Sequence, residues 1–133
     1  MLQISRKYVA EMFAHAREEN PNECCGIIAG QGGSAVKLFR TTNSEHSPYR
    51  YNVEPRELLQ VHREIEANDW DLLGIYHSHT GSPARPSPTD VRLAANWPEA
   101  LYLIVSLAEG PDPALRAFRI EGGEVLEEEI KVV

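Results

Sequence analysis

The chain has 133 residues, a length at which one domain buries roughly two thirds of the unfolded chain's surface in a single core. Its net charge of −7 at pH 7 argues against nucleic acid as the main partner, because phosphate binding needs a basic face. No apolar stretch reaches the roughly 20 residues of a membrane span, and Met1 to Met12 lacks the apolar centre of a signal peptide. We therefore expect one domain over residues 1–133, no membrane partner and a cytoplasmic location.

The amino-terminal part of the chain predicts a helix followed by a hairpin. Ser5 is a suitable N-cap, and apolar residues recur at helical spacing up to Asn20, where the following proline disfavours helical geometry. The apolar run over residues 23–30 predicts a central strand. The glycines in 31–33 predict a tight turn into a half-buried strand over 35–40, where apolar and polar residues alternate.

The only two cysteines, Cys24 and Cys25, lie in the first of these strands. Because they are adjacent, an ordinary disulfide between them is geometrically awkward. The chain has no Cys-x-x-Cys pair of the kind that predicts a structural zinc site. We expect both cysteines to be small buried residues, which agrees with a cytoplasmic location.

The middle of the chain predicts a loop, a second helix and a strand. Residues 41–50 are polar and indicate a loop, and 49–53 indicate a short extended piece. Pro55 suits the first turn of a helix, which Asn68-Asp69 should end. Residues 70–76 then predict a buried strand that leads directly into a pair of histidines.

The remaining elements follow a loop rich in glycine, proline and serine. Ser87 is a suitable N-cap for a helix from Pro88 to about Asn96. Residues 101–107 form the most hydrophobic segment and predict a central strand. Residues 115–120 and 124–132 predict a closing hairpin.

This mixed order of helices and strands favours an α/β (α+β) fold, a three-layer sandwich with a central mixed β-sheet flanked by helices. No strand is followed by a glycine-rich phosphate loop, so a doubly wound nucleotide-binding fold is not expected.

The strongest candidate site combines His77, His79 and Asp90. Residues two apart on a strand project from the same face, so the two imidazoles can point at one cation, and Asp90 can supply a third ligand from the next helix. Two imidazoles and one carboxylate form a usual ligand set for catalytic zinc. The alternative for the histidines is an accidental pair at a strand end. Glu23 is a solvated edge residue unless the fold brings it beside the histidines, and Ser87 is first of all a helix cap.

The spacing of these residues resembles the signature of the JAMM (MPN-plus) metalloprotease family. His77-x-His79 is followed by seven residues, Ser87, two residues and Asp90, and Glu23 lies upstream in an acidic-Cys-Gly context. Chain length and element order are also similar to compact bacterial and archaeal members. The resemblance implies a single JAMM/MPN domain with a cytidine-deaminase-like fold.

The same resemblance implies a zinc hydrolase of peptide or isopeptide bonds. It assigns Zn²⁺ to His77, His79 and Asp90, the general base role to Glu23 and an oxyanion contact to Ser87. Among small prokaryotic members it suggests the C-terminal Gly-Gly tail of a ubiquitin-like or sulfur-carrier protein as substrate. Such a tail can add as a strand beside residues 49–53.

Two alternatives remain at this point. One is a non-catalytic MPN-type scaffold, which the complete ligand set argues against. The other is a zinc hydrolase of a small amide substrate. The sequence also leaves a homodimer open.

Overall fold

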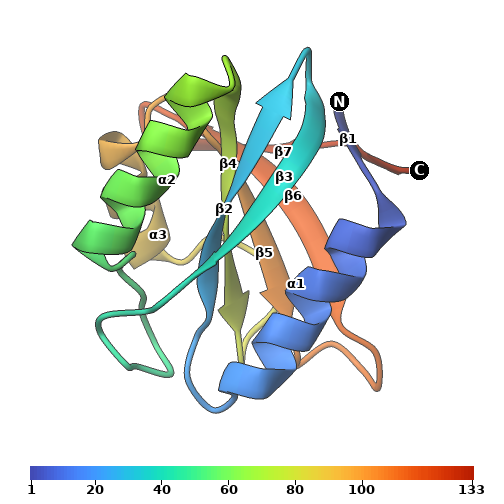
Figure 1. Ribbon diagram of the computed structural model, residues 1–133. Coiled ribbons are helices and arrows are strands. Elements are labelled where there is room, and N and C mark those ends of the chain that lie inside the picture. Colours follow the sequence, from blue (N-terminus) through green and yellow to red (C-terminus); the bar gives the residue numbers. More distant parts are fainter.

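The computed structural model, which describes residues 1–133, contains three α-helices and one mixed sheet of eight strands (Figure 1). The helices are α1 (Arg6–Glu19), α2 (Pro55–Ala67) and α3 (Pro88–Leu93), and a 3₁₀ turn over Ala94–Asn96 follows α3. The strands are β1 (Leu2–Ile4), β2 (Cys25–Gln31), β3 (Ser34–Thr41), β4 (Asp71–His79), β5 (Leu101–Ser106), β6 (Ala114–Glu121), β7 (Glu124–Glu128) and β8 (Ile130–Val132). None of the helices has the length and apolar run that a membrane crossing requires.

The strands lie in the order β7-β6-β5-β4-β2-β3-β1-β8. β5 and β2 are buried over nearly their whole length, and β4 is buried from Gly74 to His79. β4 runs antiparallel to β2 and parallel to β5, so the sheet is mixed as expected. This places the carboxyl end of β4 beside the start of β2.

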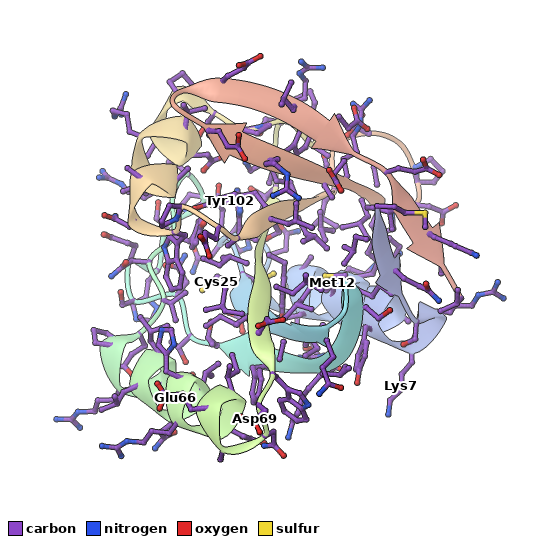
Figure 2. The ribbon with its side chains drawn as sticks, turned by 90° about the horizontal axis from the view of Figure 1, so that it is seen from above. Lys7, Met12, Cys25, Glu66, Asp69 and Tyr102 are labelled. Carbon is purple, nitrogen blue, oxygen red and sulfur yellow. The ribbon has the colours of Figure 1, made fainter.

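Helices cover both faces of the sheet. Ile28 of β2 packs on the side of α1, in one cluster with Met12, which is labelled inside the molecule in Figure 2. The neighbouring Ile27 faces the other way and packs in one cluster with Val61 of α2. α3 covers the same face as α2, over Tyr102 of β5. The predicted three-layer sandwich is therefore confirmed, and it follows from the two-residue alternation of strands that are apolar on both faces.

The end of the chain differs from the prediction. A single strand over 124–132 was expected, but the strand breaks at Glu129. β7 pairs antiparallel with β6, whereas β8 pairs parallel with β1 at the opposite end of the strand order. The Leu2 N–H donates to the Glu129 carbonyl at 2.8 Å, which anchors the break to β1. β1 itself was not predicted, because three residues are too few to show a period.

Local turns agree with the sequence more closely. Gly32 and Gly33 have φ angles of 57° and 80°, the left-handed values that a tight hairpin between β2 and β3 requires. The piece over 49–53 is not a strand of the sheet and contributes one isolated bridge, between Asn43 and Val53.

Tyr76 on β4 explains why β2 needs a glycine near its start. A Cβ atom at Gly26 would lie 2.1 Å from Cε1 of the Tyr76 ring. The ring is fully buried, and its Oη shares a hydrogen bond of 2.7 Å with Nδ1 of His15 on α1. Burial lowers the pKa of His15 to about 4, so this ring stays neutral near pH 7. Gly26 thus leaves room for the side chain that directly precedes His77.

We expect Gly26→Ala to lower the free energy of unfolding by about 1–3 kcal/mol, because overpacking displaces the ring or the strands. Gly81→Ala is the matched control, since its Cβ would meet no atom within 4 Å and its φ is not positive. Urea unfolding of both variants measures the difference. Equal stability of the two would contradict this account of the ring.

Candidate metal centre

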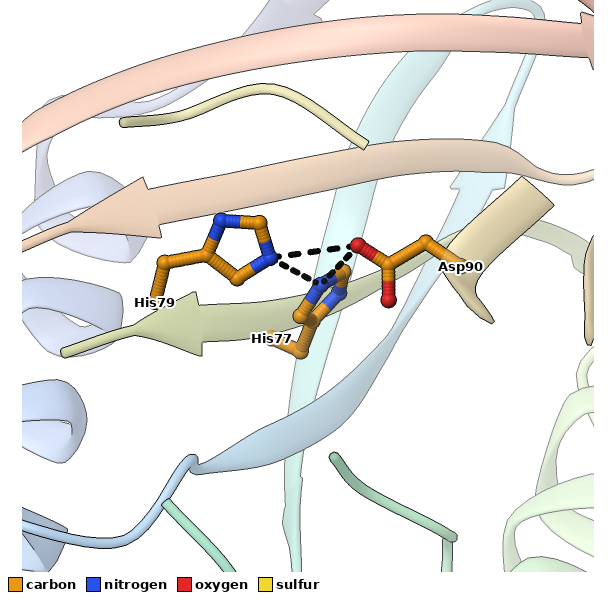
Figure 3. A group of neighbouring side chains, drawn as sticks. All are labelled: His77, His79 and Asp90. Atoms are coloured by element: carbon orange, nitrogen blue, oxygen red, sulfur yellow. Dashed lines mark hydrogen bonds and ion pairs between the residues drawn. The ribbon is translucent and has the colours of Figure 1, made fainter. Parts of the chain in front are cut away.

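His77 and His79 end β4 and project from the same face of the sheet (Figure 3). His77 lies beside Cys25 on β2 and Ile104 on β5, in the most buried part of the sheet. Both imidazoles are buried, with exposed fractions of 0% for His77 and 4% for His79. The two-residue period of the strand thus places both imidazoles on one face of the sheet, as predicted.

Asp90 reaches the histidines because it belongs to a capping box at the start of α3. The Ser87 side chain accepts a hydrogen bond from the Asp90 N–H at 3.0 Å, and the Ser87 N–H donates to Asp90 Oδ2 at 2.9 Å. Ser-x-x-Asp is a sequence signature for this arrangement. The residues that begin the helix therefore also orient the carboxylate.

Three potential ligand atoms converge at one point (Figure 3). His77 Nε2 lies 3.2 Å from both His79 Nε2 and Asp90 Oδ2, and His79 Nε2 lies 3.1 Å from Asp90 Oδ2. His79 Nδ1 donates its proton to the Pro83 carbonyl at 2.8 Å, which leaves the Nε2 lone pair pointing at the other two atoms. Three electron-rich atoms at these distances require a shared proton or a cation. His77, His79 and Asp90 thus form a possible metal-binding group.

The charges at this point suit a cation. Burial opposes ionisation of Asp90, but hydrogen bonds with His77 and His79 outweigh burial and hold its pKa well below its usual range. Burial lowers the pKa of His77, so this ring is neutral. Burial acts in the same direction on His79, but its hydrogen bonds to Asp90 and Pro83 outweigh this effect and raise the pKa. An ionised carboxylate beside a neutral imidazole has the protonation states that metal ligands need.

The fold brings Glu23 to the same site. The Cys24 N–H donates to Ser78 Oγ at 2.8 Å, and the Ser78 N–H donates to the Cys24 carbonyl at 3.2 Å, which continues the β2–β4 register and sets Glu23 opposite His79. Glu23, His79 and Ser87 line one cleft of about 380 Å³. Glu23 is therefore not a solvated edge residue.

Glu23 is 4% exposed, and its Oε1 has no hydrogen-bond partner. Burial raises the pKa of its carboxyl group to about 8, while His79 opposes this shift and Asp90 adds to it. A carboxylate with a raised pKa and a free oxygen can accept and return a proton near neutral pH.

Two residues near the site were missed by the sequence analysis. The Asn43 side-chain amide donates to the carbonyls of Glu23 and Arg50, both at 3.0 Å, and ties the loop after β3 to the segment that carries Glu23, just before β2. Tyr51 stacks on the His77 ring, with the centroids 4.4 Å apart and the planes at 21°. The polar sequence of this loop carried no pattern that could identify either contact.

Other candidate residues lie outside the centre. His46 and His62 are exposed, and His15 forms the buried pair with Tyr76. Cys24 and Cys25 are buried and free, and burial raises the pKa of their thiols to about 12 and about 11. Neither cysteine is a nucleophile near pH 7, which agrees with the structural role expected for them.

Comparison with known proteins agrees with this geometry. The sequence model described as "Prokaryotic homologs of the JAB domain" matches residues 5–121. A CysO-cysteine peptidase from Mycobacterium tuberculosis is 42% identical over 135 residues, which cover 100% of this chain and 92% of the relative. A probable TtuB-protein conjugate cleaving protease from Thermus thermophilus is 34% identical over 127 residues, which cover 94% of this chain and 80% of the relative.

A solved structure is similar over the whole chain. The solution structure of a Desulfitobacterium hafniense protein superposes with a TM-score of 0.89 at 39% sequence identity, covering 100% of this chain and 93% of that protein. The family resemblance inferred from the motif is thus confirmed. The chain belongs to the prokaryotic homologues of the JAB domain, and it is an enzyme of the peptidase class.

Proposed function

We propose that this enzyme is a zinc metallopeptidase that cleaves peptide or isopeptide bonds at the C-terminal Gly-Gly tail of a ubiquitin-like or sulfur-carrier protein. The observation that carries the proposal is the convergence of His77, His79 and Asp90 beside the cleft that Glu23 lines. Relatives named as a CysO-cysteine peptidase and as a TtuB-protein conjugate cleaving protease support a protein substrate.

Zinc fits the three ligand atoms. A tetrahedral zinc ion with ligands at about 2.0–2.1 Å holds them about 3.3 Å apart. The three distances in this chain are 3.1–3.2 Å, so little movement of the side chains is needed. Bound there, zinc would supply water activated at neutral pH and polarise the scissile carbonyl group.

Glu23 is the proposed general base. Its unpartnered Oε1 would accept a proton from the attacking water and deliver it to the leaving amine, which completes hydrolysis without a net change in its charge. The positive charge of the metal would stabilise the ionised form and counteract the effect of burial on its pKa. A lower pKa beside the cation would in turn ease delivery of the proton to the amine.

Ser87 is proposed to contact the developing oxyanion. Its Oγ accepts the Asp90 N–H, so the hydroxyl proton remains available for donation. The side chain lines the same cleft as Glu23 and His79. A donor aimed at developing charge in a buried site stabilises the transition state more than the ground state.

The cleft favours a slender, extended tail. Its lining includes the small residues Thr80, Gly81 and Ser82, together with Pro48 and Tyr49. Tyr49 is 85% exposed and stands free at the rim, where a protein substrate can cover it. Residues 49–53 are outside the sheet, so a tail would pair with loop backbone rather than with a preformed strand.

The first test is mass-spectrometric analysis of a sulfur-carrier protein extended past its Gly-Gly. We expect cleavage after the second glycine, and a loss of about 10²–10⁴-fold in kcat for Glu23→Gln, because the amide keeps the shape but cannot accept the proton. Glu45→Gln, at an exposed position, is the control and should retain activity. Cleavage of small amides alone would exclude the proposed substrate, and full activity of Glu23→Gln would exclude the base.

Zinc content tests the ligands. The purified protein should hold about one zinc ion per chain, and His79→Ala should lose most of it because only two of the three catalytic-site ligands remain. His62→Ala, which removes an exposed histidine, should keep the metal. Elemental analysis after dialysis measures both, and equal zinc in the two variants would place the metal elsewhere.

The pH dependence of stability tests the burial of Glu23. Unfolding lowers its pKa from about 8 to 4.5, so between these values the folded metal-free chain holds one proton more and its free energy of unfolding falls as pH rises. Glu23→Gln lacks this titrating group. Its free energy of unfolding relative to that of the parent should therefore rise by about 1–3 kcal/mol from pH 5 to pH 8.5. Urea unfolding with a chelator present measures it. A constant difference between the two proteins would show that Glu23 is solvated.

A further inference from the structure

Three buried side-chain polar atoms have no hydrogen-bond partner: Glu23 Oε1, His77 Nδ1 and Tyr102 Oη. The first two belong to the metal centre. Tyr102 was not part of the sequence motif, and the proposed reaction gives it no role. A buried hydroxyl group without a partner lowers the stability of the fold, so its presence calls for an explanation.

Tyr102 lies directly beneath the helix that supplies Asp90. It is 1% exposed and packs in one cluster with Ala94, which follows α3 and lies one helical turn after Asp90. Figure 2 shows it between β5 and α3. In the parallel β4–β5 register Tyr102 pairs with Ile75, and His77, two residues further along β4, faces the same side. The ring therefore occupies the layer that contains the ligands.

The carboxylate of Asp90 makes its hydrogen bonds through only one of its two oxygens. Its hydrogen bonds with His77, His79 and the Ser87 N–H all involve Oδ2. With a cation bound, the imidazole lone pairs would face it, and of these three partners only the Ser87 N–H would still donate to Asp90, at Oδ2. Metal-binding carboxylates are normally held by further hydrogen bonds, so a second donor would suit Oδ1.

The charge of Asp90 acts on the Tyr102 hydroxyl. Burial raises the pKa of the Tyr102 hydroxyl, and the negative charge of Asp90 adds to the shift. The hydroxyl therefore stays protonated at neutral pH and can donate a hydrogen bond. Asp90 is the charged group that acts on it.

We propose that Tyr102 is a positioning residue whose hydroxyl donates to the Oδ1 side of Asp90 and holds this carboxylate in place when the metal is bound. The inference rests on the proposed metal centre but not on the identity of the substrate. It predicts that the hydroxyl contributes to metal affinity while contributing nothing to the stability of the metal-free fold.

The test is zinc affinity, measured by competition with a chromophoric chelator, for the parent and Tyr102→Phe. We expect Tyr102→Phe to bind zinc about tenfold more weakly, the usual effect of removing a hydrogen bond to a metal ligand. The urea midpoint of the metal-free variant should equal or exceed that of the parent, because the substitution removes a buried hydroxyl without a partner. A purely space-filling tyrosine would leave the affinity unchanged.

Tyr8→Phe is the matched control. The Tyr8 hydroxyl donates to the Val36 carbonyl at 2.6 Å on the α1 side of the sheet, so its loss should lower stability and leave zinc affinity intact. In an Asp90→Asn background, Tyr102→Phe should cause no further loss of affinity. Equal affinity of the parent and Tyr102→Phe would overturn this inference alone, whereas failure of the parent to bind zinc would overturn the metal centre as well.

Discussion

The pairing of β2 with β4 is the constraint on which the rest of the centre depends. The two hydrogen bonds between Cys24 and Ser78 set Glu23 opposite His79, although the two residues are far apart in the sequence. A shift of this register by one residue would turn a whole strand over, moving the imidazoles towards α1 and away from Asp90. The close approach of Tyr76 to Gly26 opposes such a shift, because a shift by one residue would bring Cys25 or Ile27 to the place where Gly26 leaves room for the ring.

Two of the three buried polar atoms without partners, Glu23 Oε1 and His77 Nδ1, belong to the candidate metal centre. Each group that is removed from water without full compensation lowers the stability of the fold. Burial also raises the pKa of the Glu23 carboxyl group to about 8, so that it titrates near neutral pH. The burial that makes the Glu23 carboxyl group reactive therefore also lowers the stability of the fold.

Much of the architecture could be predicted because it depends on local sequence. Ser87 and Asp90 fit the sequence pattern of a capped helix. The shared direction of the His77 and His79 side chains follows from the two-residue period of a strand. Contacts between distant segments could not be predicted. The stacking of Tyr51 on His77 and the pairing of β8 with β1 depend on where the rest of the chain passes, and neither leaves a periodic pattern in the sequence.

The capping box at the start of α3 has a consequence for the dynamics of the metal-free protein. α3 has only six residues, too few to persist without help from its surroundings, and its first turn shares Asp90 with the centre. If a metal binds as proposed, its loss would remove a restraint on the helix as well as the source of activated water. Amide protons of this segment should then exchange with solvent through brief local opening, while the central strands stay closed, so that backbone exchange in one short helix reports metal occupancy.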